Sequence, residues 1–148
     1  MNRKFYNTID REKVYTTGNN NINHPFYGTL SEFIGKWKLQ DKRCLEIGSN
    51  KGLFQDLVYD YTGIDIVQQL SANYHKNYIV ASGANLPFYD QSFDAIFSYA
   101  THEHIFDIEL ALEEIIRVLR LNGVCLFAPA WHSRPWFSQG YKIRNLSW

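Results

Sequence analysis

The sequence predicts one α/β domain in which a parallel β-sheet is covered by helices on both faces. Its 148 residues can form one sizeable core, and 45% of them are apolar. From residue 43 to residue 128, short apolar runs alternate with segments whose apolar residues recur at helical spacing. Strands that alternate with helices are joined by right-handed crossovers, which produce a parallel sheet buried on both faces.

The first helix is predicted over residues 30–38. Thr29 and Glu32 have the spacing of a capping box, in which each side chain bonds the other residue's backbone N–H. Apolar residues then follow at helical spacing: Leu30, Phe33, Ile34 and Trp37. Residues 1–28 are polar and turn-rich, so we expect an N-terminal arm of low order before this helix.

Five apolar runs bounded by turn-forming or polar residues are predicted as strands. They span residues 43–47, 61–66, 78–81, 93–98 and 124–128. Pro87 disfavours helix at the residue before it, so residues 85–88 are expected to form a loop. The carboxyl ends of the strands, where parallel sheets bind ligands, are Gly48, Asp65, Ser82 and Ser98.

Three further helices are predicted between the strands. One begins at Gly52, and its apolar residues are Leu53, Phe54, Leu57 and Val58. Another covers residues 67–74. Asp107 can cap the last one, over residues 108–120, and Asn122-Gly123 is expected to end it. Its predicted apolar face consists of Ile108, Ala111, Leu112, Ile115 and Leu119.

Composition and charge exclude several classes of protein. The 15 Lys and Arg balance 15 Asp and Glu, so net charge gives no overall case for binding nucleic acid or an anionic membrane. The sequence shows no signal peptide and no apolar run of about 18 residues that would span a membrane. Cys44 and Cys125 lie in apolar runs and are expected to be small buried hydrophobes in a reducing, cytoplasmic protein.

The zero net charge is divided unevenly along the chain. Residues 1–43 carry a net charge of +4, residues 44–130 a net charge of −7, and residues 131–148 a net charge of +3. The acidic middle suits a cationic ligand, and the basic ends are where a second, different ligand is expected to bind.

A glycine-containing loop lies between the first strand and the segment after it, with the sequence Glu46-Ile47-Gly48-Ser49-Asn50-Lys51-Gly52. Gly48 permits a tight turn and close approach of a ligand to the backbone. Asp65 ends the second strand, where a carboxylate can accept hydrogen bonds from two ribose hydroxyls. This order of elements indicates a cofactor that contains a nucleoside.

Two residues of this loop argue against a phosphate-containing cofactor. Asn50 stands where a dinucleotide fingerprint has its middle glycine, and Glu46 would repel a pyrophosphate. A carboxylate is compatible with a cofactor that carries a sulfonium and an ammonium. The Gly-Lys-Ser/Thr sequence of a P-loop is absent.

With these residues the chain resembles the class I S-adenosylmethionine-dependent methyltransferases, most closely their small-molecule, type 11 branch. The motifs, in order, are Glu46-x-Gly48-x-x-x-Gly52, Asp65, residues 85–88, residues 92–96, Glu103-His104-Ile105 and residues 114–119. The resemblance implies a Rossmann-like three-layer sandwich with strand order 3-2-1-4-5 and two further strands after the fifth. The chain is therefore expected to be truncated, with an exposed fifth strand through which copies could associate.

The resemblance also implies the cofactor-binding residues. The loop would hold the methionine part of S-adenosylmethionine, Asp65 the ribose and Ile66 the adenine ring. The full set is Glu46, Gly48, Ser49, Asn50, Gly52, Asp65, Ile66, Ser82, Gly83, Ala84 and Ser98. Three positions depart from the family pattern: Asn50 replaces a glycine, Ser82 an aspartate, and Leu121-Asn122-Gly123 a Pro-Gly-Gly.

Candidate catalytic and acceptor-binding residues follow the fourth and fifth strands. His104 is the candidate general base, and Tyr99, His102, Trp131 and Arg134 are candidates for binding the acceptor. No metal is expected, because His102 and His104 are two residues apart and do not converge on one helix face. The aromatic and basic tail suits a small-molecule or saccharide acceptor.

The sequence therefore predicts S-adenosylmethionine-dependent methyl transfer to a small molecule or glycan. The predicted division is an arm (residues 1–28), a cofactor-binding core (residues 29–130) and a tail (residues 131–148). A nicotinamide-dependent oxidoreductase and a non-catalytic, methyltransferase-like binding or interaction domain are the alternatives.

Overall fold

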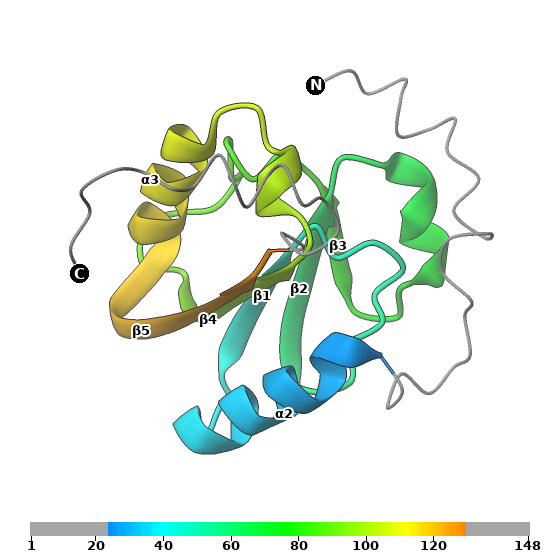
Figure 1. Ribbon diagram of the computed structural model, residues 1–148, viewed down its shortest axis with the longest axis vertical. Helices are drawn as coiled ribbons and strands as arrows, with labels where there is room; N and C mark the ends of the chain where they lie inside the picture. The colour runs from blue at the N-terminus through cyan, green and yellow to red at the C-terminus, as the bar shows by residue number, and fades with distance from the viewer. Residues whose placement is uncertain (1–23, 130–148) are drawn as a thin grey trace, which may run out of the picture.

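The computed structural model describes residues 24–129, which form a five-stranded sheet. The strands are β1 (Arg43–Ile47), β2 (Asp60–Asp65), β3 (Asn77–Val80), β4 (Phe93–Tyr99) and β5 (Leu119–Ala128). Their order is β3-β2-β1-β4-β5, and every neighbouring pair is parallel, which confirms the predicted fold class and strand order (Figure 1).

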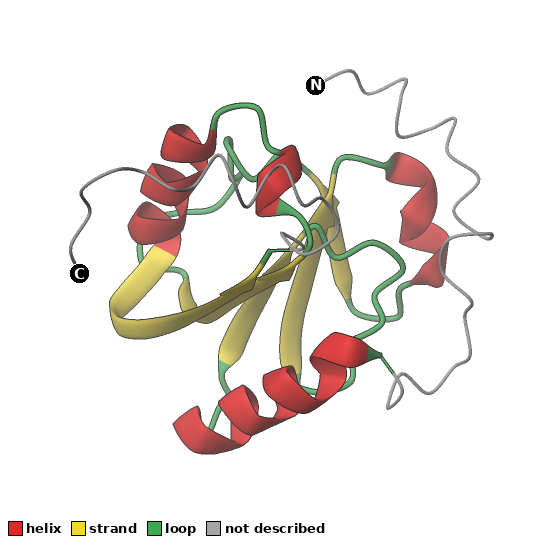
Figure 2. Ribbon diagram, in the orientation of Figure 1, coloured by secondary structure: helices red, strands yellow, loops and turns green. Residues whose placement is uncertain are grey.

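Helices cover both faces of the sheet (Figure 2). Helix α2 (Pro25–Trp37) buries Phe26, Leu30 and Ile34 against one face, in a cluster that includes Cys44, Tyr61 and Phe97. Helix α3 (Ile108–Val118) buries Ile115 and Val118 against the other face, with Leu45, Ile64 and Ile96. The two clusters lie on opposite sides of β1 and β4, as expected for central strands that are apolar on both faces.

The loop after β1 lies where the order of the strands in the sheet reverses relative to their order in the chain. β1 pairs with β2 on one side and with β4 on the other. The chain crosses from β1 to β2 on one side, and after β3 it returns to β4 on the other side of β1. Open α/β sheets bind ligands at such a topological switch point.

Helix α2 begins earlier than the sequence pattern predicted, so the proposed capping box at Thr29 and Glu32 is wrong. His24 is the N-cap, and its Nδ1 accepts a hydrogen bond from the Phe26 N–H at 3.2 Å. Pro25 occupies the first helical turn, where its fixed φ favours helix and its missing N–H costs nothing. The helix therefore takes in residues that were expected to belong to the arm.

The helix predicted from Gly52 to Val58 is also wrong, because this segment forms consecutive turns. Gly52 has φ +69°, a left-handed conformation that a right-handed helix cannot contain. The apolar pattern was nonetheless informative, since Phe54 and Val58 are both buried against the core. The helix predicted over residues 67–74 is present as the 3₁₀ helix η2 (Gln68–Asn73), with Val67 and Tyr74 as its caps.

Helix α3 starts as predicted, with the Asp107 carboxylate accepting from the Leu110 N–H at 3.0 Å. It ends at Val118, and the chain passes directly into β5, so Asn122-Gly123 lies within a strand and does not end the helix. Phe93 pairs with Leu119 and Ala95 pairs with Val124, so the intervening residues of β5 form a bulge against β4. Ile108 and Leu112 are exposed, so the buried face of α3 is narrower than predicted.

The two cysteines have different environments. Both are free; Cys44 is buried as expected, but Cys125 is exposed. Cys125 lies on β5, which within residues 24–129 pairs with a strand on one side only. In that same part of the chain, no helix has the length and apolar character needed to cross a membrane.

Candidate functional site

The loop after β1 joins the carboxyl ends of β1 and β2. The backbone N–H groups of Gly48 and Ser49 both donate to the Ile64 carbonyl oxygen at 2.9 Å, and Ser49 Oγ donates to the same oxygen at 3.1 Å. Gly48 has φ +71°, and a Cβ at this position would lie 2.1 Å from Thr101 Oγ1. Glycine is therefore required here both by backbone conformation and by the close approach of the loop after β4.

Asp65 fixes the next part of this loop. Its Oδ2 accepts from the Asn50 N–H at 3.1 Å, and its Oδ1 accepts from the Val67 N–H at 3.2 Å. Asn50 has φ 47°, so an asparagine adopts the left-handed conformation that the replaced glycine would favour. An ionised carboxylate has about four acceptor positions, so Asp65 can bind ligand hydroxyls as well as these two N–H groups.

Glu46 lies beneath the loop and is almost completely buried, with an exposed fraction of 3%. The Tyr61 hydroxyl donates a hydrogen bond to its Oε2. Burial raises the pKa of Glu46 to about 8, the Tyr61 hydrogen bond acts in the opposite direction, and the negative charge of Asp65 adds to the rise. The site thus contains a buried carboxyl group whose ionised form a nearby cation would stabilise.

Tyr74 holds the loop from the side of η2. Its hydroxyl lies 2.7 Å from Ser49 Oγ and 2.8 Å from the Asn50 carbonyl oxygen. A Cβ at Gly52 or at Gly63 would lie less than 3 Å from the Tyr74 ring, so both glycines make room for it. Neither tyrosine was among the predicted site residues. Tyr61 shares a strand face with Asp65 at i, i+4, a signal that could have identified it.

The loop after β3 contains the residues expected beside adenine. Ser82 is exposed, and its Oγ accepts from the Ala84 N–H at 3.2 Å. Gly83 is buried, and a Cβ there would lie 2.9 Å from Ile105 Cδ1. Ile66 is half-buried directly after Asp65. The structure thus places Ser82, Gly83 and Ile66 at the carboxyl ends of β2 and β3.

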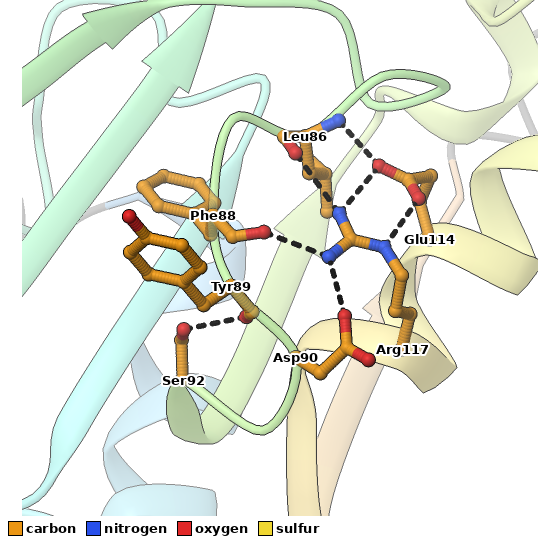
Figure 3. A network of polar contacts seen from close by, with 7 residues as sticks. All are labelled: Leu86, Phe88, Tyr89, Asp90, Ser92, Glu114 and Arg117. Carbon is orange, nitrogen blue, oxygen red and sulfur yellow. Dashed lines mark hydrogen bonds and ion pairs between the residues drawn. The ribbon is translucent and has the colours of Figure 1, made fainter.

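A network of polar contacts fixes the following loop, residues 85–90, to helix α3 (Figure 3). The Arg117 guanidinium donates to Glu114, to Asp90, and to the backbone carbonyl oxygens of Leu86 and Phe88 at 2.7–3.0 Å. Glu114 in turn accepts from the Leu86 N–H at 2.6 Å. Hydrogen bonds from Arg117 also hold the pKa of the Glu114 carboxyl below its usual value.

Replacing Arg117 by glutamine is expected to lower the free energy of unfolding by about 1.5–3 kcal/mol, because a charged group loses several hydrogen bonds. Equilibrium urea unfolding measures the change. Arg120→Gln is the matched control: Arg120 bonds Asp94 at 2.8 Å and Gln91 at an exposed site, where about 1 kcal/mol or less is expected. Equal losses in the two variants would contradict a specific role for the Arg117 network.

The carboxyl end of β4 carries two of the expected residues in different environments. Ser98 is buried, with an exposed fraction of 1%. Tyr99 is half-buried, stacks on Phe26 with a ring separation of 5.0 Å, and meets the His24 ring edge-on at 5.0 Å. Tyr99 therefore connects the start of α2 to the site.

The two histidines after β4 lie in the short helix η3 (His102–His104). The His102 ring contacts Phe127 at 4.5 Å, and burial lowers its pKa. The His104 side chain is exposed, and its backbone N–H donates to the Thr101 carbonyl at 2.8 Å. Residues 24–129 contain no cluster of three or more His, Cys, Asp or Glu side chains that could hold a metal ion. The other predicted acceptor-binding residues, Trp131 and Arg134, lie outside this range.

Buried polar atoms with no hydrogen-bond partner gather at these same strand ends. Within the described part of the chain they include Asn50 Oδ1, Ser98 Oγ and His102 Nε2. Buried polar atoms are normally paired with protein or water, so these atoms are available to hydrogen-bond a ligand or water. Together with the Gly48 turn and the two acids, they fit a polar ligand that carries hydroxyls and positive charge.

Comparison with known proteins gives one family match. The sequence model of a family described as a methyltransferase domain matches residues 45–127. These residues run from β1 to β5 and include every element that forms the site. No curated protein sequence matches the chain.

Solved structures share the fold at low sequence identity. A protein from Methanococcus maripaludis, assigned to the S-adenosyl-L-methionine-dependent methyltransferases, aligns with a TM-score of 0.64 and 19% identity over 94% of this chain and 70% of its own. A SAM-dependent methyltransferase from Thermotoga maritima gives 0.57 and 23%, over 84% and 58%. The [4+2]-cyclase SpnF gives 0.57 and 20%, over 66% and 43%. The chain thus spans about half the length of several structures that it matches.

Proposed function

This chain belongs to the family of methyltransferase domains, and from that membership we propose that it binds S-adenosylmethionine and transfers the methyl group to a small-molecule or glycan acceptor. The observation that carries this proposal is the hydrogen bond from the Asn50 N–H to the Asp65 carboxylate. It connects the glycine turn to an acid that can bind ribose hydroxyls. The cofactor supplies a methyl group on a sulfonium centre, which is an electrophile for in-line displacement.

We propose that the chain's own residues hold the cofactor from three sides. The Gly48 turn exposes bare backbone, Asp65 offers carboxylate oxygens to hydroxyls, and Glu46 offers negative charge to a cation. Ser82, Gly83 and Ile66 lie at the next strand ends, where adenine would be placed. The unpaired Asn50 Oδ1 supports the same assignment.

Positioning is the main catalytic contribution expected from such a site. Holding the acceptor and the methyl carbon together can supply up to roughly 7–11 kcal/mol. We propose His104 as the general base for a hydroxyl or amine acceptor, supported by its exposed imidazole at the end of η3, the short helix that follows β4. Tyr99, His102, Trp131 and Arg134 are proposed to bind the acceptor.

The site supports methyl transfer better than nicotinamide chemistry. Glu46 is buried two residues before the glycine turn, and its ionised form would attract the cationic part of S-adenosylmethionine and repel a pyrophosphate. The fold alone does not decide between activities, since the cyclase SpnF shares it. The choice therefore rests on Glu46 and on the other residues at the ends of β1 and β2.

A methyl-transfer screen tests this proposal directly. The whole chain is incubated with S-adenosylmethionine labelled in its methyl group and with panels of saccharides, amines and small hydroxylated metabolites. We expect label to appear in at least one acceptor and S-adenosylhomocysteine to inhibit the transfer. Binding of S-adenosylhomocysteine without transfer to any acceptor would favour the non-catalytic alternative.

A further inference from the structure

Tyr61 is placed to control the charge of Glu46. It lies on β2, directly beside β1, and its side chain is almost completely buried. Its hydroxyl donates to Glu46 Oε2, and its ring packs in parallel against Tyr74 with a centroid separation of 6.5 Å. The pKa of Tyr61 is well above its usual value, mainly because of burial, so the phenol stays protonated and remains a donor.

Several titratable groups surround Glu46; burial and the charge of Asp65 favour its neutral form, whereas the Tyr61 hydrogen bond favours the carboxylate. On β2 these are Tyr61 and the negatively charged Asp65, and beyond η2 there is Tyr74. On β4 the register partner of Glu46 is Phe97, which carries no charge. On the α2 side the buried residues are apolar, and His24 at the helix start lies against other rings, those of Phe54 and Tyr99.

No described basic side chain is paired with Glu46. The ion pairs within residues 24–129 join Arg43, His75, Lys76, Arg117 and Arg120 to other acids. The only hydrogen bond assigned to the Glu46 carboxyl group in this region comes from the neutral Tyr61 hydroxyl. A positive charge brought by a ligand would therefore be the first cation to stabilise the carboxylate at close range.

We infer that Tyr61 is a positioning residue that holds Glu46 as the counter-charge for the cofactor's cationic part, so that cofactor binding releases a proton from Glu46 to solvent. This inference rests on the proposed function, because it takes the ligand to be S-adenosylmethionine or its product. The O–H bond of the Glu46 carboxyl group breaks, the carboxylate remains beside the ligand cation, and the proton passes to the buffer.

The direction of the pH dependence follows from burial. Because the pKa of Glu46 is about 8 in the free protein, the group is mostly neutral at pH 7 and must lose its proton when a cation binds. Affinity is then expected to rise with pH by up to about tenfold per unit and to level off near pH 8. Removing the Tyr61 hydroxyl takes away a bond that favours the carboxylate, so it raises the pKa further and moves the rise to higher pH.

Isothermal titration calorimetry with S-adenosylhomocysteine tests this inference between about pH 6 and about pH 9, in pairs of buffers with different ionisation heats. The native chain should release close to one proton at pH 7. Tyr61→Phe should bind about tenfold more weakly at pH 7 and recover at higher pH. Glu46→Gln should bind without pH dependence and without proton release. The neutral ligand 5′-methylthioadenosine should release no proton from the native chain.

Tyr78→Phe is the matched control, because the Tyr78 hydroxyl bonds the Val67 carbonyl at 2.5 Å and the ring also packs on Tyr74. It should leave the pH profile unchanged. Circular dichroism checks folding, and Glu46→Gln carries the test if Tyr61→Phe does not fold. If the native chain binds independently of pH and releases no proton, this inference is overturned and the proposed function is not. Absence of binding at every pH would instead overturn the proposed function.

Discussion

Replacing Asp65 by asparagine is expected to weaken binding of S-adenosylhomocysteine by about 1–3 kcal/mol, or roughly 5- to 150-fold. Asp65 accepts one N–H from Asn50 and one from Val67, on different carboxylate oxygens. An asparagine amide keeps one oxygen and presents an NH₂ group to the other N–H, so a donor faces a donor. The glycine turn then loses its link to β2 at the same time as the ligand hydroxyls lose an ionised acceptor.

Calorimetric titration measures this loss, and Asp56→Asn is the control. Asp56 is exposed and pairs with His75 at 2.7 Å, and it precedes β2. The control should bind with native affinity. Native affinity in Asp65→Asn as well would show that Asp65 does not take part in binding.

Replacing Gly48 by alanine should have the largest effect on stability, a loss of about 2–5 kcal/mol in the free energy of unfolding. Two costs combine. A residue with a side chain pays about 1–2 kcal/mol to adopt a left-handed φ, here +71°. The added methyl also overlaps Thr101, whose Oγ1 would lie only 2.1 Å from it, and the loop must move.

Urea unfolding of Gly48→Ala and Gly28→Ala separates this local conflict from a general effect of alanine. Gly28 lies in helix α2 with nothing within 4 Å of an added Cβ, so alanine there should stabilise the chain by up to about 1 kcal/mol. Thr101→Gly in the Gly48→Ala background should restore the part of the loss caused by overlap. A Gly48→Ala variant as stable as the native chain would contradict the described turn.

Much of the fold could be predicted because its strands are short apolar runs with clear boundaries. β1 has the predicted bounds, and the other strand predictions overlap the observed strands. Helix starts were less predictable. Both His24-Pro25 and Thr29 can begin a helix, and the earlier start buries Phe26 in the core. The turn segment after Gly52 was missed, since helical periodicity and burial of Phe54 and Val58 are also compatible with consecutive turns.

The candidate site could be predicted where a residue's chemistry depends on its place at a strand end. Gly48, Asn50 and Asp65 follow β1 or end β2, and the structure joins them in one hydrogen-bonded turn. Tyr74 could not be predicted, because its contact with Ser49 depends on how η2 returns the chain toward the loop. Thr101 was missed for the same reason, since its contact with Gly48 joins two segments that are distant in sequence.

Calorimetric titration of the whole chain with S-adenosylhomocysteine tests the proposal that the ends of β1 and β2 bind S-adenosylmethionine. NADH serves as the comparison ligand, since a nicotinamide enzyme would prefer it. We expect saturable binding of one S-adenosylhomocysteine per chain and no measurable heat from NADH. Absence of heat at millimolar S-adenosylhomocysteine, or saturable binding of NADH in its place, would show that these strand ends are not an S-adenosylmethionine site.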